Sequence, residues 1–369
     1  MDVEITVTER YSEGARERQE ALCCPVDYDS GLLALLPQEI IERDYGCGDP
    51  SRYVRPGDVV LDLGSGGGKI CYMAAQLTGT GGRIIGVDMN DDMLALARKY
   101  QAEMADRLGG DRVRFVKGYI QDLALDIEAL GHYLAANPVR QPADYSALRA
   151  WEQRQRREAP LIPDASVDLV ISNCVLNLVA DSEKQQMVRE IFRVLKPGGR
   201  IAISDIVSDQ SIPQSMKQDP DLWSGCISGA YEESEFANSF AAAGFNGVCY
   251  DKWDPQPWRV IAGITFRSVT LTAMKPASHA EHAGTRTVMY RGPFAAVIDD
   301  SGRRFDRGSH ETVSPGNHQQ LLNTAYGNAF IDLSNAAVTE TATSCCGGPA
   351  PVTGAEAEGK AASHGGCCG

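Results

Sequence analysis

The sequence contains no long apolar run, no long basic run and no cysteine–histidine spacing that resembles a zinc finger. No apolar run approaches the roughly 18 residues that a membrane-spanning helix needs, so we expect no membrane partner. The 369-residue chain has a net charge of −14, so we expect no nucleic-acid partner. Its first 20 residues are polar and lack the apolar core of a signal peptide, so we expect a cytoplasmic protein.

The eleven cysteines include no C-x-x-C motif and no spacing typical of a zinc finger. In a reducing cytoplasm they are expected to be thiols rather than a disulfide framework. Their odd number also argues against complete structural pairing. Six of them lie in adjacent pairs: Cys23-Cys24, Cys345-Cys346 and Cys367-Cys368.

The most informative stretch runs from Asp58 to Tyr72 and reads DVVLDLGSGGGKICY. Its apolar run, residues 59–63, predicts a buried parallel strand. The glycines that follow allow a tight turn and a close approach of the backbone to a ligand. Lys69 is expected to begin a helix. This order of strand, glycine loop and helix is typical of a nucleotide-type site at the carboxyl end of a strand.

The glycine loop also distinguishes between cofactors. A dinucleotide fingerprint would need its third glycine at Lys69, whereas the pattern here is acid-x-G-x-G-x-G from Asp62 through Gly68. That pattern resembles motif I of class I S-adenosylmethionine (SAM) methyltransferases. A second strand, residues 83–87, ends in Asp88, close to the spacing at which an acid meets ribose hydroxyls. The candidate SAM-binding residues are Asp62, Gly64, Ser65, Gly66, Gly68, Asp88, Met89, Ile120 and Asn173. The alternative is a tight βα turn in an unrelated α/β domain.

Alternating strands and helices over residues 58–275 predict an α/β fold with a parallel, doubly wound, Rossmann-like sheet. Residues 1–57 are expected to form an N-terminal arm and lid, with a helix at 32–43 and with Cys23, Cys24 and Cys47. Residues 285–332 are interpreted as a small, mostly β C-terminal domain. Residues 334–369 are rich in Ala, Gly, Ser and Thr, so we expect a disordered tail. The connection at 124–163 is expected to contain a solvated helix over 148–158 and no chemistry.

Three cysteines are expected at the carboxyl ends of the strands, where ligands sit in doubly wound sheets. Cys71 follows the first strand, Cys174 follows the strand at 167–172, and Cys226 follows the strand at 200–204 after a loop. Three thiolates suit a soft, three-coordinate ion, and binding displaces their protons. A buried cysteine is also often only a packing residue, and for Cys174 alone both interpretations stay open. Cys249 is expected in the core, and the six histidines on the surface.

Several motifs together resemble those of arsenite SAM methyltransferases. They are the Cys23-Cys24-Pro25 and 45–50 stretches, the Asp62–Gly68 loop, residues 118–123, the Ser-Asn-Cys-Val-Leu-Asn-Leu run at 172–178 and the Gly-Cys-Ile-Ser-Gly-Ala run at 225–230. The resemblance covers roughly residues 21–275. Two features depart from the family pattern, namely the long 124–163 connection and Gln121, where many relatives carry Glu.

The resemblance implies a role for each cysteine. Cys174 and Cys226 would hold trivalent arsenic throughout, Cys71 would be the third thiolate, and Cys47 would form a disulfide with Cys71 after a turnover. The implied substrates are arsenite and then methylarsenite, the implied cofactor is SAM, and a reductant of the thioredoxin or glutathione type is implied as a partner. Thiolate-bound arsenic keeps a lone pair that can attack the sulfonium methyl without a general base. Positioning the reactants could lower the barrier by on the order of 7–11 kcal/mol.

Two other functions stay open at this point. A methyltransferase for a small carbon, nitrogen or oxygen nucleophile would need a base near the site and would tolerate loss of the cysteines. A non-catalytic, thiol-rich protein that sequesters metalloid would bind without turnover and would leave the Asp62–Asp88 constellation unexplained.

Overall fold

The computed structural model describes residues 3–19, 26–277, 284–322, 326 and 328–334. The expectations for the tail at 334–369 and for the three adjacent cysteine pairs fall almost entirely outside these ranges. Among the described residues, no helix is long and apolar enough to cross a membrane.

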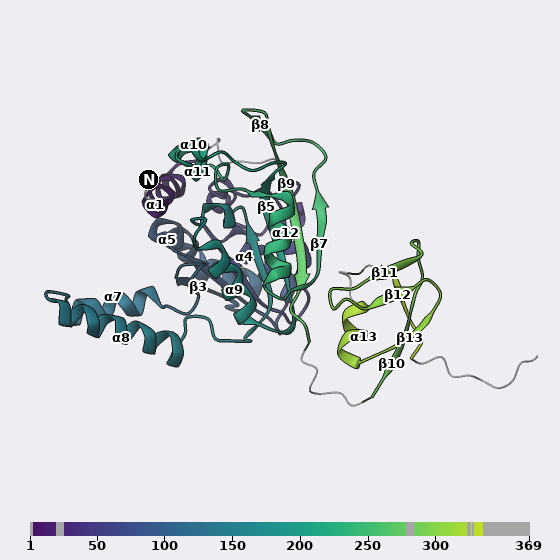
Figure 1. Ribbon diagram of the computed structural model, residues 1–369. Coiled ribbons are helices and arrows are strands. Elements are labelled where there is room, and N and C mark those ends of the chain that lie inside the picture. The colour runs from purple at the N-terminus through teal and green to yellow at the C-terminus, as the bar shows by residue number, and fades with distance from the viewer. Residues whose placement is uncertain (1–2, 20–25, 278–283, 323–325, 327, 335–369) are drawn as a thin grey trace, which may run out of the picture. The chain divides into compact units, whose positions relative to one another are not determined.

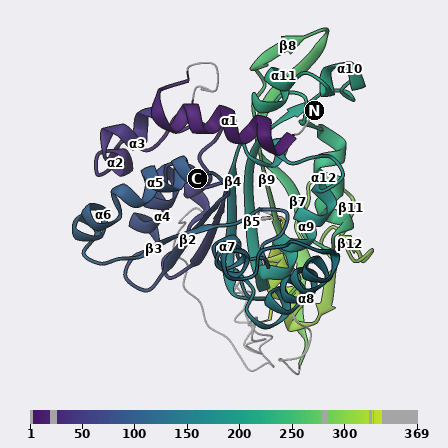
Figure 2. The same ribbon diagram turned by 90° about the vertical axis from the view of Figure 1, so that its left-hand side faces the viewer.

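A nine-stranded sheet forms the centre of the fold (Figure 2). Its parallel part has the order β3 (Val113–Lys117), β2 (Arg83–Asp88), β1 (Val59–Leu63), β4 (Val167–Asn173) and β5 (Leu195–Ser208). β9 (Ile264–Met274) and β7 (Asn246–Trp253) continue the sheet in antiparallel orientation, and β6 (Tyr231–Glu232) and β8 (Arg259–Ile261) add short edges. The predicted Rossmann-like fold is confirmed, but its sheet is mixed, because the strands at this edge are antiparallel where a parallel sheet was expected. Here β7 and β9 are linked through β8 rather than by a crossover helix, which parallel neighbours would require.

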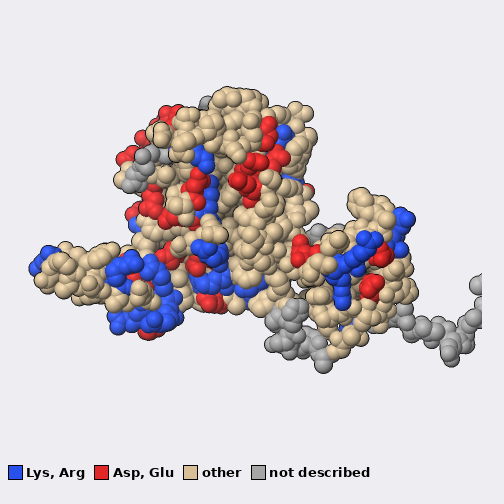
Figure 3. Space-filling view, viewed as in Figure 1, with Lys and Arg blue, Asp and Glu red and all other residues tan. Residues whose placement is uncertain are grey.

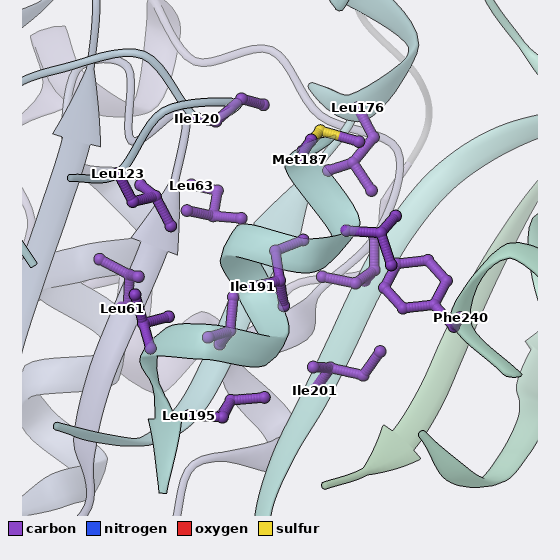
Figure 4. Close-up of a cluster of buried hydrophobic side chains, with 14 of the residues drawn as sticks. Leu61, Leu63, Ile120, Leu123, Leu176, Met187, Ile191, Leu195, Ile201 and Phe240 are labelled. Atoms are coloured by element: carbon purple, nitrogen blue, oxygen red, sulfur yellow. The ribbon is translucent and has the colours of Figure 1, made fainter. Parts of the chain in front are cut away.

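Helices cover both faces of the parallel part, because successive strand residues point to opposite faces. Leu61 and Leu63 of β1 pack with α9 (Lys184–Val194) and α12 (Glu233–Ala242), whereas Val60 packs with α4 (Lys69–Thr78) on the other face. Figure 4 shows Met187 and Ile191 of α9 among the strand side chains of the first face. α5 (Asp91–Lys99) and α6 (Gln101–Leu108) complete the second layer.

The N-terminal arm lies across the carboxyl ends of the parallel strands (Figure 2). Its first helix, α1 (Val3–Arg16), is held by Asn90, whose Nδ2 donates to the Thr8 carbonyl and to Ser12 Oγ, both at 3.0 Å. The single helix expected at 32–43 is instead two short ones, α2 (Ser30–Leu33) and α3 (Gln38–Glu42), because Pro37 interrupts it. The arm therefore covers the edge at which ligands bind in this kind of sheet.

The connection at 124–163 folds into a helical hairpin of α7 (Ile127–Ala136) and α8 (Pro142–Glu158) (Figure 1). The rings of Tyr133 and Trp151 stack between the helices, with centroids 4.6 Å apart. Basic side chains gather over α8 (Figure 3), and Arg156 ties it to Asp122 at 2.8 Å. The solvated helix predicted at 148–158 is therefore longer than expected, and α7 was not predicted.

The small C-terminal domain is mostly β, as expected. β10 (Arg286–Tyr290) pairs with β13 (His310–Val313) and β14 (Phe330–Asp332), and β11 (Ala296–Ile298) pairs with β12 (Arg304–Asp306). One helix, α13 (Pro315–Leu321), completes the domain. Its core consists of Val288, Tyr290, Phe305, Val313, Leu321 and Phe330.

Candidate active site

The glycine loop after β1 has the backbone that its sequence predicts. Gly64, Gly66 and Gly68 all have positive φ, at 66°, 50° and 88°. A Cβ on Gly64 would also collide with the Val175 side chain, so the loop needs glycine for space as well as for conformation. Asp88, at the end of β2, accepts the Gly66 N–H at 2.8 Å through Oδ2 and the Asn90 N–H at 2.9 Å through Oδ1. The loop and the acid are therefore fixed relative to each other.

A large cavity opens above this loop, between the carboxyl ends of the strands and α1. All the predicted cofactor residues line it except Gly68, which is the N-cap of α4 and lies against Phe115. Ser65 Oγ is buried and has no hydrogen-bond partner among the described residues, as expected for a group that a ligand would satisfy. Burial raises the pKa of Asp62 to about 8 and also raises the pKa of Asp88. The cavity thus fits a polar, nucleoside-containing cofactor.

Several residues of the cavity were missed by the sequence analysis. Val3, Val7 and Tyr11 line it from α1, and Glu183 lies at the far end, where its carboxylate is 3.3 Å from Gln121 Nε2. The signal that could have revealed them is the spacing of Val3, Val7 and Tyr11, which places three apolar side chains on one face of a helix.

Three of the four predicted arsenic-site cysteines come together beside this cavity. Cys47 and Cys174 form a disulfide, and the Cys226 thiol donates a hydrogen bond to the Cys174 carbonyl at 3.2 Å. All three are buried in one apolar cluster, which also contains Val7 of α1 and Trp223 of α11 (Pro220–Ser224). Cys174 also lines the cofactor cavity. A soft ligand bound here would therefore lie next to the cofactor.

Asn173, the last residue of β4, brings Cys47 to this place. Its Oδ1 accepts the backbone N–H groups of Cys47 and Gly48 at 2.9 and 3.0 Å. A Cβ on Gly46 would collide with the Asn173 side chain, and one on Gly48 would lie 2.5 Å from Ser204 Cβ. The Gly-Cys-Gly sequence is therefore what allows this loop to pack against the strand ends.

The backbones of Cys174 and Cys226 adopt an unusual conformation. Their φ angles are 59° and 61°, in the left-handed region that favours glycine. A non-glycine residue held there costs about 1–3 kcal/mol, and such residues cluster at functional sites. The turn after Cys174 is held by Asp205, whose Oδ2 accepts the Leu176 N–H at 3.0 Å. Two strained cysteines with adjacent side chains point to a site in which thiol direction matters.

Asp205 is a further residue that the sequence analysis missed. Its carboxylate lies at the end of the buried strand β5, within 4.8 Å of the sulfurs of Cys47 and Cys174. Burial raises its pKa to about 7, against the opposing effect of three backbone hydrogen bonds. The sequence signal was an acid within a buried strand at the sheet edge that also carries Asp62 and Asp88.

Cys71 lies apart from the other three cysteines. It is fully buried in the first turn of α4, in the apolar layer that contains Val60, and its thiol donates to Asp62 Oδ2 at 3.2 Å. Burial, and then the nearby Asp62 carboxylate, raise its pKa well above the usual thiol value. The disulfide that the resemblance implied between Cys47 and Cys71 is thus not the one in this structure, because the Asn173 contacts hold Cys47 against Cys174. The prediction that Cys249 lies in the core is wrong, since it is exposed on the edge strand β7.

Comparisons with known proteins agree with this site. A methyltransferase domain family matches residues 55–131 and 151–244, and a domain of unknown function matches residues 278–361. The unmatched residues 132–150 form much of the α7–α8 hairpin. The arsenite methyltransferase of Aquipseudomonas alcaligenes is 30% identical over 314 residues, which cover 81% of this chain and 80% of the relative. The human arsenite methyltransferase is 28% identical over 310 residues, covering 80% and 72%.

A solved structure extends this likeness to three dimensions. It is the crystal structure of an arsenic (III) S-adenosylmethionine methyltransferase from Chlamydomonas reinhardtii, with 28% identity and a TM-score of 0.56, covering 85% of this chain and 98% of that one. The methyltransferase domain and the cavity at its glycine loop identify SAM as the cofactor. The chain therefore belongs to the arsenite methyltransferase family.

Proposed function

We propose that the protein transfers the SAM methyl group to trivalent arsenic, first on arsenite and then on methylarsenite, in arsenic biotransformation and detoxification. One observation carries this proposal: Cys47, Cys174 and Cys226 are gathered in one buried cluster, and Cys174 lines the cofactor cavity. Thiolates are soft ligands suited to arsenic, and their placement aims the bound atom toward the cavity. When bound, SAM supplies an electrophilic methyl group on its sulfonium.

Cys174 and Cys226 are proposed to stay bound through both methylations. Arsenite can take a third thiolate, and Cys47 and Cys71 are the candidates. Cys47 is already within bonding distance of Cys174, which supports it as a sulfur that reaches the arsenic. Cys71 lies in the apolar layer that contains α4, and its thiol is hydrogen-bonded to Asp62, which lines the cavity. It can therefore bind the arsenic only after the glycine loop or α4 shifts. We therefore propose that these two cysteines serve the first methylation, one as third ligand and one as its redox partner.

A disulfide balances the electrons of the reaction. The arsenic lone pair forms the new bond to carbon, the carbon–sulfur bond of the sulfonium breaks, and arsenic becomes pentavalent. The free thiolate of the Cys47 and Cys71 pair then attacks the sulfur of the arsenic-bound one, a disulfide forms, and the arsenic–sulfur bond breaks. The electron pair of that bond returns arsenic to the trivalent state, with one methyl group and the Cys174 and Cys226 thiolates as its three substituents. The Cys47–Cys174 disulfide of this structure is a different pairing of Cys47, open to Cys174 only when that sulfur holds no arsenic. A thiol reductant of the thioredoxin or glutathione type would then restore the thiols, which suits a cytoplasmic location.

The competing functions are less well supported by the geometry. An organic nucleophile would need a general base, but three carboxylates of the cavity are already engaged. Asp88 accepts backbone N–H groups, Asp62 accepts the Cys71 thiol, and Glu183 accepts the Gln121 amide. A purely sequestering protein would leave the cofactor cavity and the unsatisfied Ser65 hydroxyl without a role. The direct test is incubation of the purified protein with SAM, arsenite and a thiol reductant, followed by separation of the arsenic species. Methylated arsenic supports the proposal, whereas bound but unmethylated arsenic would indicate sequestration.

A further inference from the structure

A second, much smaller cavity lies beside the cofactor cavity. It is lined by Cys174 and Cys226 together with the aromatic residues Tyr11, Tyr45 and Trp258. Tyr11, Tyr45 and Cys174 also line the cofactor cavity, so the two spaces share a boundary at the thiols. An arsenic atom held by Cys174 and Cys226 would thus face the cofactor on one side and the aromatic rings on another.

The small cavity offers little room. Its volume is about 10 Å³, compared with about 110 Å³ for the cofactor cavity. A cavity needs roughly 10–15 Å³ to hold a single water molecule. The space beside the cysteines is therefore about that of one water molecule, so it takes at most one small substituent and not two methyl groups.

Contacts fix the Tyr11 and Tyr45 side chains and the backbone of Trp258. The Tyr11 hydroxyl is 3.8 Å from Cys226 Sγ, and its ring meets that of Tyr45 edge to face with centroids 6.2 Å apart. The Tyr45 hydroxyl in turn donates to the Gly14 carbonyl of α1 at 3.0 Å. Trp258 enters from the segment between β7 and β8, where its backbone N–H donates to the Phe266 carbonyl at 2.8 Å. Enlarging the cavity would therefore require α1 or the β8 hairpin to move.

We infer that Tyr11, Tyr45 and Trp258 form a wall that limits the number of methyl groups added to arsenic, stopping the reaction at the dimethyl product. This inference rests on the proposed function and identifies the residues that determine how many methyl groups the product carries. Trivalent arsenic has three substituents and one lone pair, and the lone pair must face the sulfonium methyl. Methylarsenite uses two thiolates and places one methyl in the small cavity, which fits. Dimethylarsenite keeps one thiolate and must place two methyls there, which the wall does not allow.

The test compares wall variants with a matched control, using methylarsenite and dimethylarsenite as substrates. Trp258→Ala, with Trp258→Leu as a milder second variant, enlarges the cavity without touching the cofactor cavity. Trp253→Ala removes an exposed tryptophan of β7 outside both cavities and serves as the control. For each variant we compare the trimethyl-to-dimethyl ratio, which is the amount of trimethylated product, including the volatile fraction, divided by the amount of dimethylated product. Binding of dimethylarsenite, followed by calorimetry, gives a readout that does not depend on turnover.

The wall predicts that the trimethyl-to-dimethyl ratio rises roughly 10–200-fold in the Trp258 variants, the discrimination typical of about one methylene in an apolar pocket. Dimethylarsenite should also bind more tightly to these variants, and Trp253→Ala should match the wild type in both measurements. A wild-type enzyme that converts arsenite mainly to trimethylarsine would overturn the inference, as would Trp258 variants with the wild-type ratio. A wild type that produces no methylated arsenic at all would instead contradict the proposed function.

Discussion

Asn173 and Cys47 are 126 positions apart in the chain, yet the Asn173 side-chain oxygen accepts the Cys47 backbone N–H at 2.9 Å. The same oxygen accepts the Gly48 N–H at 3.0 Å. This contact fastens the N-terminal arm to the end of β4 and sets the Cys47 sulfur against that of Cys174. It is therefore a positioning interaction for the thiol site, in addition to the cofactor role expected of Asn173.

Asn173→Ala should release the Cys47 loop. Two buried N–H groups would lose their acceptor, at a cost of about 1–3 kcal/mol each in the free energy of unfolding. The Cys47–Cys174 disulfide should then form more slowly after reduction and reoxidation, as measured by mass spectrometry of alkylated peptides. Asn173→Asp keeps an acceptor oxygen and serves as the control. Equal disulfide yields in Asn173→Ala and wild type would show that the contact does not position Cys47.

Asp88→Ala should weaken SAM binding. The carboxylate is held at the cavity wall by the Gly66 and Asn90 N–H groups, where it can accept the ribose hydroxyls. Loss of a hydrogen bond to a charged group costs roughly 1.5–3 kcal/mol, or about 10–150-fold in the dissociation constant. Calorimetry measures this directly. The exposed neighbour Asp91, changed to Ala, should leave binding unchanged, and an unaltered constant for Asp88→Ala would refute the assignment.

Asp205 should make the stability of the disulfide-bonded protein depend on pH. Burial raises its folded-state pKa to about 7, above its ordinary value of 3.8. The fold therefore favours the protonated acid, so this stabilisation is fully present below about pH 4 and is lost as the pH rises through about 7. Asp205→Asn should abolish the decrease in stability that Asp205 causes between pH 4 and 7. Denaturant midpoints measured across this pH range check the expectation. Parallel pH profiles for variant and wild type would contradict this.

Cys47→Ser should remove the need for a reductant in substrate binding. In the oxidised protein Cys174 is tied to Cys47, so it cannot bind arsenic until the disulfide is reduced. The variant leaves Cys174 free to pair with Cys226 on methylarsenite. Arsenic content after gel filtration, measured with and without reductant, checks this expectation. Cys249→Ser, which alters an exposed thiol of β7, is the matched control and should behave like wild type.

The cofactor half of the site could be predicted because its signals are local. The glycines and Asp62 are contiguous, and Asp88 follows at a spacing that the strand–loop–helix unit fixes. The position of Cys47 could not be predicted, because it depends on a contact with Asn173 that forms only when the chain folds. Likewise, the spacing of Val3, Val7 and Tyr11 indicates a helix with an apolar face but not the surface on which it docks.

The direction of the last strands of the sheet could not be predicted from the sequence either. The apolar residues of β7 and β9 predict strands but carry no information on orientation, which the β8 connection decides. The exposure of Cys249 follows from β7 being an edge strand, and the residues of β7 do not say whether another strand covers it. Cys71 follows the glycine loop as expected, but the helix directs its thiol toward Asp62 beneath the loop, away from the other cysteines.

The most direct measurement of the central claim, that Cys174 and Cys226 hold the arsenic, is product analysis of four serine variants with two substrates. Serine keeps the shape of cysteine but is a hard, poor ligand for arsenic. Cys174→Ser and Cys226→Ser should each abolish methylation of both arsenite and methylarsenite. Cys47→Ser and Cys71→Ser should lose arsenite methylation and retain that of methylarsenite, which takes only two thiolates. A Cys174→Ser or Cys226→Ser enzyme that methylates methylarsenite at the wild-type rate would contradict the account.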